Sequence, residues 1–178
     1  MRLRTTALAM TTVAAAALGT FATAGPAQAA DFYNIEIDLA DGKCLDVPNS
    51  NFSNGVDVQE WSCNGTNAQR WDVVYVSSQY FQVRVHAKPS LCLNNWNSRG
   101  TKGDPIKLYA CNSSTDSWFN QVGSGWNDYF QFQPKNASST CVTAWGGTAQ
   151  GAKMKLDTCD NRSYGSYFDL WSIVHSEN

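Results

Sequence analysis

The chain has 178 residues, of which 12% are aromatic and 16% are charged. This length fits one domain of ordinary size or two small ones, and the composition is that of a folded chain rather than a disordered one. The formal net charge of −2 gives no reason to expect nucleic acid or an anionic membrane as a partner.

The N-terminus has the pattern of a secretory signal peptide. Arg2 and Arg4 form a short basic region, Ala7–Leu18 is weakly apolar, and Ala27–Ala29 supplies an A-x-A cleavage pattern. The apolar stretch is shorter than the ~20 residues of a transmembrane helix, and no other segment qualifies. We therefore expect a signal peptide at residues 1–29 and a secreted, extracellular chain without membrane insertion. An uncleaved membrane anchor is the alternative.

Because an exported protein meets an oxidising environment, the six cysteines are candidates for a disulfide framework. Short and long gaps of 19, 29, 19, 30 and 18 residues alternate along the chain. This rhythm favours three local bridges, which join Cys44 to Cys63, Cys92 to Cys111, and Cys141 to Cys159. Such separations do not match the usual spacing of zinc ligands, so we expect neither a metal site nor a cofactor.

A longer period of 48–49 residues underlies the cysteine pattern. A glycine stands eight residues before the second cysteine of each pair, at Gly55, Gly103 and Gly151. An aromatic pair stands twelve residues before each first cysteine, at Phe32-Tyr33, Tyr80-Phe81 and Tyr129-Phe130. The sequence therefore predicts three tandem repeats, at about residues 31–78, 79–127 and 128–178.

Each repeat has the pattern of β-strands. Ile35–Ile37 and Val83–Val85 alternate with a period of two, and three further runs are short and β-prone: Val56–Val58, Trp71–Val74 and Ile106–Leu108. Outside the signal segment, no window sustains helical periodicity. Three repeats are too few for a propeller of about four or more blades, whereas a closed threefold arrangement leaves no open sheet edge. The prediction is an all-β fold.

The motifs of the first repeat resemble those of a known family. Cys44-Leu45-Asp46, the Q-x-W-x-C-N-G run Gln59–Gly65 and the Q-x-W run Gln69–Trp71 are similar to motifs of the ricin-type β-trefoil lectin family. The resemblance covers about residues 32–174, essentially the whole predicted lectin domain, 30–178. It implies a six-stranded barrel capped by three hairpins, with one potential sugar pocket in each repeat.

Asp46 and Trp61 are the main candidates for sugar binding in the first repeat. Asp46 lies two residues after Cys44, and Trp61 lies two before Cys63. If the bridge closes an antiparallel strand pair, these two side chains become near cross-strand neighbours. A carboxylate can accept hydrogen bonds from two adjacent hydroxyls, and an indole offers a flat apolar face to a pyranose ring. The alternatives are a turn cap for Asp46 and a core position for Trp61.

Gln59 and Asn64 are further candidates for ligand contact. Gln59 lies on the same strand face as Trp61, and its amide can both donate and accept. Asn64 stands just past the bridge. The resemblance implies that Asp46 is the binding acid, Trp61 the stacking aromatic, and Gln59 a supporting polar residue.

One position of the first repeat departs from the family pattern. The residue before the Q-x-W glutamine is often a binding asparagine, but here it is Ala68, and Asn67 stands one place early. We interpret Gln69 and Trp71 as structural, with Gln69 bonding to the backbone and Trp71 in the core.

The second repeat has a weaker version of the site. Asn94 replaces the aspartate, Tyr109 replaces the tryptophan, and Lys107 stands in the place of Gln59. A neutral amide makes hydrogen bonds about half as strong as those of a carboxylate. We therefore predict a weaker second site at Asn94 and Tyr109.

The third repeat has lost the stacking platform. Thr143 and Asp157 occupy the places of the aspartate and the tryptophan, so we expect no sugar site there. Trp96 and Trp145 each stand four residues after a first cysteine. They are either displaced platforms or residues that pack the loops.

Two other classes of function compete with sugar binding. An enzyme is disfavoured because the sequence contains no G-x-S-x-G, H-E-x-x-H or phosphate-loop motif. A secreted inhibitor or other protein-binding trefoil with vestigial sugar sites remains the alternative, because one fold can carry many functions. We predict a non-catalytic carbohydrate-binding protein that takes galactose- or xylose-type sugars, or a polysaccharide, mainly through its first repeat. The sequence leaves the oligomeric state open.

Overall fold

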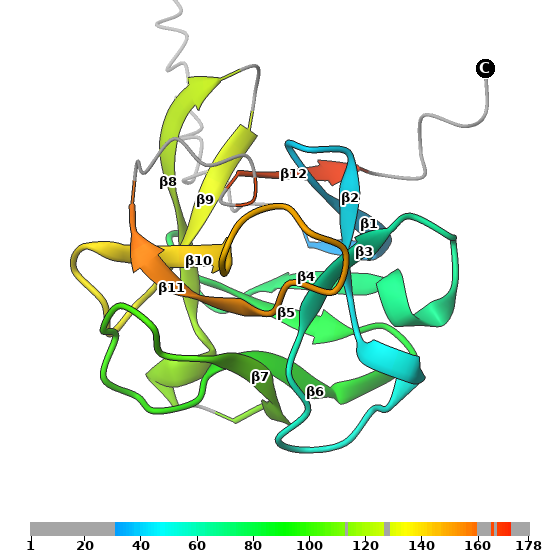
Figure 1. Cartoon of the computed structure of the whole chain (residues 1–178). Coiled ribbons are helices and arrows are strands. Elements are labelled where there is room, and N and C mark those ends of the chain that lie inside the picture. The colour runs from blue at the N-terminus through cyan, green and yellow to red at the C-terminus, as the bar shows by residue number, and fades with distance from the viewer. Residues whose placement is uncertain (1–30, 113, 127–128, 160–164, 166, 172–178) are drawn as a thin grey trace, which may run out of the picture.

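A computed structural model describes residues 31–112, 114–126, 129–159, 165 and 167–171 (Figure 1). The predicted signal peptide at residues 1–29 lies outside these ranges. Nowhere in the described ranges does a helix reach the length and apolar character that a membrane crossing requires.

Twelve strands and three short 3₁₀ helices form in the described residues. The barrel strands are β1 (Phe32–Leu39), β4 (Trp71–Tyr75), β5 (Phe81–Val85), β8 (Phe119–Trp126), β9 (Tyr129–Pro134) and β12 (Phe168–Trp171). The hairpin strands are β2 (Lys43–Asp46), β3 (Gln59–Ser62), β6 (Lys88–Asn95), β7 (Ile106–Ala110), β10 (Thr140–Ala144) and β11 (Met154–Thr158). The 3₁₀ helices are η1 (Pro48–Ser50), η2 (Asn67–Gln69) and η3 (Thr115–Ser117).

The six barrel strands close into a ring of antiparallel pairs. β1 pairs with β4, β4 with β5, β5 with β8, β8 with β9, β9 with β12, and β12 with β1. The hairpins β2–β3, β6–β7 and β10–β11 stand at three positions around the molecule (Figure 1). Closure leaves the ring without a free sheet edge. The predicted all-β fold, a β-trefoil of three similar units, is confirmed.

The three hairpins meet one another through equivalent backbone bridges, namely Asp57 with Lys107, Pro105 with Lys155, and Lys153 with Gln59. The predicted strand at Val56–Val58 is wrong, because only its middle residue forms a bridge and no ladder continues from it. The β-prone run instead crosses to the next hairpin, where the amide of Val58 donates to the carbonyl of Ile106.

The core is built from residues that recur with the repeat. Trp71, Phe119 and Phe168 hold the same place in the three repeats and are fully buried. Phe132 stacks on Phe168, with ring centroids 4.6 Å apart. The indole nitrogen of Trp71 donates to the carbonyl of Leu45 at 3.0 Å, so this buried polar group is satisfied. The predicted core position of Trp71 is confirmed.

All three predicted disulfides form, and each lies within one repeat: Cys44–Cys63, Cys92–Cys111 and Cys141–Cys159. Their Cα atoms are 5.0–5.1 Å apart. Each bridge closes a short loop, a constraint worth about 3 kcal/mol in the chain-entropy model. The bridges therefore hold each of the three hairpins closed.

The recurring glycine has a backbone reason, and each copy lies close to a tryptophan of another repeat. Its φ is +84° in the first repeat, +89° in the second and +85° in the third, a left-handed conformation that favours glycine. A Cβ at each glycine would lie 3.4–3.8 Å from a tryptophan ring of another repeat. The three contacts are Gly55 with Trp96, Gly103 with Trp145, and Gly151 with Trp61.

Candidate functional site

The first repeat forms a pocket of about 490 Å³ between the β2–β3 hairpin and the helices η1 and η2. The four residues predicted from the sequence, Asp46, Gln59, Trp61 and Asn64, all line it. The fold therefore gathers the predicted first site into one concave surface.

The strand register agrees with the expectation that Asp46 and Trp61 are near cross-strand neighbours. Asp46 lies opposite Gln59, whereas Trp61 lies opposite Cys44. Asp46 and Trp61 are thus diagonal neighbours across the hairpin rather than direct partners. Diagonal pairs stay within reach of long and aromatic side chains, so both groups still face the same pocket.

Two amide side chains hold the carboxylate of Asp46. Gln59 Nε2 donates to Asp46 Oδ1 at 2.8 Å, and Gln69 Nε2 donates to Asp46 Oδ2 at 3.1 Å. The Asp46 side chain is only 5% exposed. Burial raises the pKa of Asp46 above its ordinary value, while the hydrogen bonds from Gln59 and Gln69 oppose that shift. These contacts orient the acid toward the pocket, and they account for Asp46 without a role as a turn cap.

Gln69 does more than the backbone bonding predicted for it. Its Oε1 accepts from the amide of Asn64 at 2.7 Å, and its Nε2 donates to the carbonyl of Ser62 at 3.0 Å. These bonds confirm the structural role. The third bond, to Asp46, makes Gln69 a residue that positions the candidate binding acid. The sequence contained a signal for this contact, because Asp46 and Gln69 both belong to the motifs of the first repeat.

Trp61 is half-buried and lies outside the hydrophobic core. Its ring rests against Gly151 in the loop between β10 and β11 (the β10–β11 loop). A Cβ at this glycine would lie 3.5 Å from Trp61 Cζ3, which is an ordinary van der Waals contact. The third repeat therefore supports the aromatic platform of the first. The alternative core position for Trp61 is wrong.

On the η2 wall of the pocket, an alanine stands where the family pattern often has a binding asparagine. Ala68 lines the pocket and is buried, whereas Asn67 is exposed and lies outside the lining. The side chain of Asn64 accepts from Thr66 N at 3.1 Å and from Thr66 Oγ1 at 2.7 Å. Asn64 therefore shapes its own turn, and its contact with a ligand stays a prediction.

The second repeat forms a pocket of about 410 Å³, which the predicted residues Asn94 and Tyr109 line. Trp96 lines it too, with its ring edge-to-face to Tyr109 at a centroid distance of 5.6 Å. Both aromatic side chains are 39% exposed. Trp96 therefore fits both interpretations of it, as loop packing against Gly55 and as a displaced aromatic surface.

Asp116 is a pocket residue that the sequence analysis missed. It comes from η3 and lines the second pocket. Its carboxylate accepts from Ser114 Oγ at 2.8 Å and from Asn136 Nδ2 at 2.9 Å. Asp116 stands one residue before Ser117, as Ala68 stands before Gln69. Alignment of the repeats at this position is the signal that would have found it.

Lys107 does not take over the role of Gln59 in the second pocket. It lies opposite Asn94 in the hairpin, but its Nζ reaches Asp57 Oδ1 at 2.7 Å and the carbonyl of Gly55 at 3.2 Å. The ammonium group is thus engaged at the junction between hairpins. Asn94 consequently lacks the amide support that Asp46 receives from its opposite strand.

In the third repeat, Asp157 is paired with Lys102 at 2.6 Å, and Thr143 is buried. Trp145 is 36% exposed, with Lys155 Nζ 5.0 Å from its ring centroid. A cation over the ring occupies a face that a sugar would need. These contacts support the expectation that the third repeat has no site.

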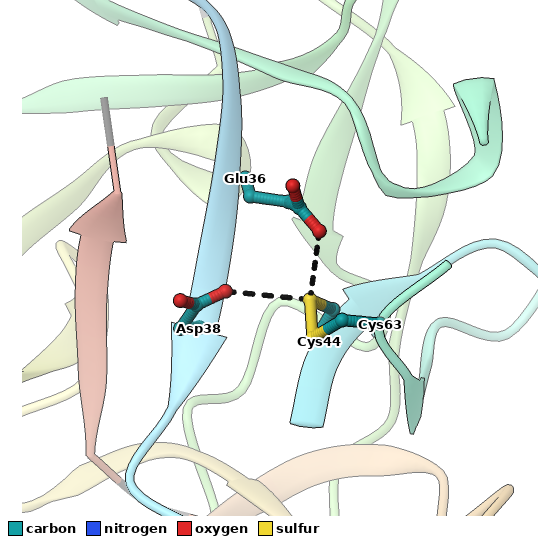
Figure 2. Close-up of side chains that lie close together, drawn as sticks. All are labelled: Glu36, Asp38, Cys44 and Cys63. Carbon is teal, nitrogen blue, oxygen red and sulfur yellow. Dashed lines mark hydrogen bonds between the residues drawn. A yellow bond between two sulfur atoms is a disulfide. The ribbon is translucent and has the colours of Figure 1, made fainter. Parts of the chain in front are cut away.

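Four groups of metal-ligand type lie close together behind the first hairpin. Figure 2 shows Glu36 and Asp38 of β1 reaching toward the Cys44–Cys63 bridge. Cys44 Sγ lies 3.2 Å from Glu36 Oε1 and 3.3 Å from Asp38 Oδ1. Metal ions bind cysteine as the thiolate, and here both sulfur atoms are used in the disulfide. Glu36 is also paired with Arg70 at 3.1 Å, so the cluster fits a structural role.

Solved structures with the same fold include a designed protein, a galactanase and an agglutinin. The designed threefold symmetric protein ThreeFoil matches with a TM-score of 0.72 and 18% identity over 78% of this chain and 98% of its own. An exo-beta-1,3-galactanase from Clostridium thermocellum matches with a TM-score of 0.69 and 15% identity, over 79% of this chain and 30% of its own. The agglutinin from Abrus precatorius matches with a TM-score of 0.61 and 18% identity, over 84% and 52%. At these identities the likeness concerns the fold.

Sequence comparison gives one short curated relative and one family. A stretch of 27 residues, 15% of this chain, is 63% identical to "Serine protease 1" of Rarobacter faecitabidus. It spans only 5% of that protein's length. The sequence model of the family described as "Ricin-type beta-trefoil lectin domain-like" matches residues 20–109, half of the chain. Together with the ring of strands and the three intra-repeat bridges, this match shows that the chain belongs to the ricin-type β-trefoil lectin-domain family.

Proposed function

We propose that this protein is a secreted, non-catalytic lectin-like protein that binds galactose- or xylose-type sugars, or polysaccharides containing them, mainly through its first repeat. The observation that carries the proposal is the pair formed by Asp46 and Trp61 in one pocket. The acid is held in place by two amides, and the aromatic ring is half-exposed next to it.

The pocket offers two complementary kinds of contact to a pyranose. Each carboxylate oxygen of Asp46 accepts one amide hydrogen and keeps a second lone pair for a sugar hydroxyl. Bonds to a charged acceptor are the stronger kind. Trp61 supplies an apolar surface for the C–H face of the ring. Because the amides already orient Asp46, little conformational entropy is lost when the sugar binds.

The strength of binding follows from how shallow and simple the site is. One stacking surface and a few hydrogen bonds that exchange with water give a Kd of ~mM, about −4 kcal/mol. Ala68 in place of a polar residue removes one further contact. The second pocket, with Asn94, Tyr109 and Asp116, adds a weak site. It contributes mainly on a polymer, where binding at the first pocket raises the effective concentration at the second.

The non-catalytic part of the proposal is supported by the surroundings of His86. This residue forms a pair with Asp72, with Nδ1 2.7 Å from Oδ1, which is two members of the kind of triad that serine proteases use. The hydrogen bonds of His86 among the described residues run to Asp72 and to the carbonyl of Arg70, with no nucleophilic hydroxyl or thiol. The 27-residue match to a protein named as a serine protease is also too short to supply residues from separate segments.

The test is a glycan array together with a polysaccharide pull-down, using wild type, Asp46→Asn and Trp61→Ala. Asp46→Asn keeps the size of the side chain and removes its charge. Trp145→Ala is the matched control, because it removes an exposed tryptophan from the third repeat. We expect both first-site variants to lose at least about tenfold in affinity, about 1.4 kcal/mol, and the control to bind as wild type does. Wild type that binds no glycan, or binding that survives both first-site changes, would exclude the proposal and favour a protein partner.

A further inference from the structure

Glu60 occupies a place that the other two repeats fill with leucine. It stands three residues before the second cysteine of its repeat, as Leu108 and Leu156 do. All three side chains are 0% exposed. Their backbone amides make equivalent bonds to neighbouring repeats, with the carbonyls of Ala152, Val56 and Asp104 as acceptors. A carboxyl group in an apolar layer costs stability, so packing alone does not account for it.

The carboxyl group of Glu60 is poorly compensated. Neither of its oxygens has a hydrogen-bond partner among the described residues. Lys43 Nζ lies 3.9 Å from Glu60 Oε1 but is held by Asp41 Oδ2 at 2.5 Å and by the carbonyl of Thr148 at 2.6 Å. Burial, together with the nearby charge of Asp41, raises the pKa of Glu60 to about 7, and the charge of Lys43 opposes this shift.

The surroundings of Glu60 contain few other charges. Asp41 and Lys43 come from the start of the β2–β3 hairpin and the turn before it. The part of the β10–β11 loop that faces Glu60, residues 148–152, contains no ionisable side chain. Lys153, which follows it, is paired with Asp57. If Glu60 ionises, neither of the two neighbouring lysines is free to pair with its carboxylate.

The β10–β11 loop connects Glu60 to the aromatic platform of the first pocket. This loop passes beside β3 (Figure 1). The amide of Gly151 donates to the backbone carbonyl of Glu60 at 2.9 Å, and Ser62 Oγ donates to Gln150 Oε1 at 2.9 Å. Gly151 is also the residue against which the Trp61 ring rests. β3 thus holds the loop on both sides of Trp61, through the backbone of Glu60 and the side chain of Ser62.

We propose that Glu60 is a positioning residue for the first pocket, whose neutral acid form keeps the β10–β11 loop seated under Trp61 and whose ionisation unseats the loop and weakens sugar binding. The proposal rests on the proposed sugar-binding function of that pocket. It adds a pH dependence that the second pocket lacks, because the equivalent residue there is Leu108.

Ionisation can be relieved in two ways, and each loosens the same loop. Water can enter between β3 and the loop and hydrate the carboxylate. This breaks the hydrogen bond from the amide of Gly151 to the carbonyl of Glu60. Alternatively, Lys43 can turn from the carbonyl of Thr148 toward Glu60, which releases that carbonyl. Leaving a buried charge unpaired is the costlier outcome, so the loop is expected to move.

The first experiment measures sugar affinity from pH 6 to pH 8.5 by calorimetry, using the sugar that the array identifies. Wild type is expected to weaken by about fivefold or more across this range, with its midpoint near pH 7. Glu60→Gln, which keeps the shape without the charge, is expected to hold the pH 6 affinity throughout. Glu60→Leu installs the residue of the other repeats and is expected to do the same. Histidine side chains ordinarily titrate in this range, so His86→Gln is the control and should keep the wild-type profile.

A second experiment separates this proposal from the sugar-binding function. Hydrogen exchange of the Gly151 amide is compared between wild type and Glu60→Gln at each pH, so that the intrinsic pH dependence of exchange cancels. The ratio of the two rates is expected to rise several-fold between pH 6 and pH 8.5. If no glycan binds but this ratio rises, the proposed function fails and the positioning role of Glu60 stands. If the ratio stays constant, or if wild type and Glu60→Gln share one affinity profile, the role of Glu60 is overturned.

Discussion

The first and second pockets have the same scaffold but place their charge on opposite walls. In the first, the acid is Asp46 on β2, and the facing position on η2 is Ala68. In the second, β6 carries the neutral Asn94, and the equivalent position on η3 is Asp116. Each pocket thus keeps one carboxylate.

The difference between these pockets lies in how the carboxylate is supported. Asp46 is held by two buried or half-buried glutamine amides, whereas Asp116 is held by the short side chains Ser114 and Asn136. In the second repeat, Ser117 stands where Gln69 stands in the first. The hydroxyl of Ser117 accepts from Gln82 Nε2 at 3.1 Å and donates to the carbonyl of Ser114 at 3.2 Å. The scaffold survives such changes because the core and the disulfides stabilise it, whereas the orientation of the site residues depends on single side chains.

The largest effect on stability and affinity is expected from Gln69→Ala, which removes the hydrogen bonds that support the first pocket. The change leaves Asp46, the amide of Asn64 and the carbonyl of Ser62 without a buried partner. We expect the free energy of unfolding in urea to fall by about 3 kcal/mol, and sugar affinity to fall with it. Ser117→Ala is the matched change in the second repeat and should cost about 1 kcal/mol. Equal losses in the two variants would mean that the two scaffolds are supported alike.

The next largest effect is expected from pH acting on Glu60. Because its pKa is raised to about 7 in the folded protein, the folded state binds the proton more tightly than the unfolded state. The stabilisation is therefore fully present below the ordinary pKa of glutamate and is lost as the pH rises through about 7. We expect the free energy of unfolding to fall by up to about 3 kcal/mol between pH 5 and pH 8. In Glu60→Leu this decline should be much smaller, and an equal decline would contradict the assignment.

A smaller effect is expected from making the first pocket resemble the second at the η2 wall. Ala68→Asn supplies a polar group where Asp116 stands in the other repeat. One added hydrogen bond is worth about 1 kcal/mol, so monosaccharide affinity should rise by about threefold to fivefold. Asn67→Ala is the control, because that side chain lies outside the pocket lining. Titration calorimetry would measure the change, and an unchanged affinity in Ala68→Asn would show that the η2 wall does not meet the sugar.

The smallest effect is expected from Tyr109→Ala, which removes an aromatic surface of the second pocket. The first pocket is left intact, so monosaccharide affinity should be unchanged within error. Binding to a polysaccharide should weaken by about twofold to tenfold, because the second contact on the same chain is lost. Affinity electrophoresis in a polysaccharide gel measures this difference directly. A monosaccharide affinity that falls as much as the polymer affinity would place the main site in the second repeat.

The sequence by itself determined the features that recur at a fixed spacing. The three disulfides, the glycine before each second cysteine and the core aromatics all follow from the period. So do the residues that line the first pocket, since Asp46, Gln59 and Trp61 are placed by one hairpin and one bridge. The disulfides and the hairpin residues are readable because they depend on contacts between residues close together in the chain. The glycines and the core aromatics are readable because each recurs at the same place in every repeat.

Only the tertiary structure decided how the repeats act on one another. The contact of Gly151 with Trp61 and the burial of Glu60 both arise where the third repeat meets the first. The failed strand at Val56–Val58 has the same origin, because its bonds go to the next hairpin. Sequence periodicity describes one repeat at a time, whereas these contacts exist only once the barrel has closed and the three hairpins have met. For that reason the side chains that line the first pocket were predictable, and their support across the repeat boundary was not.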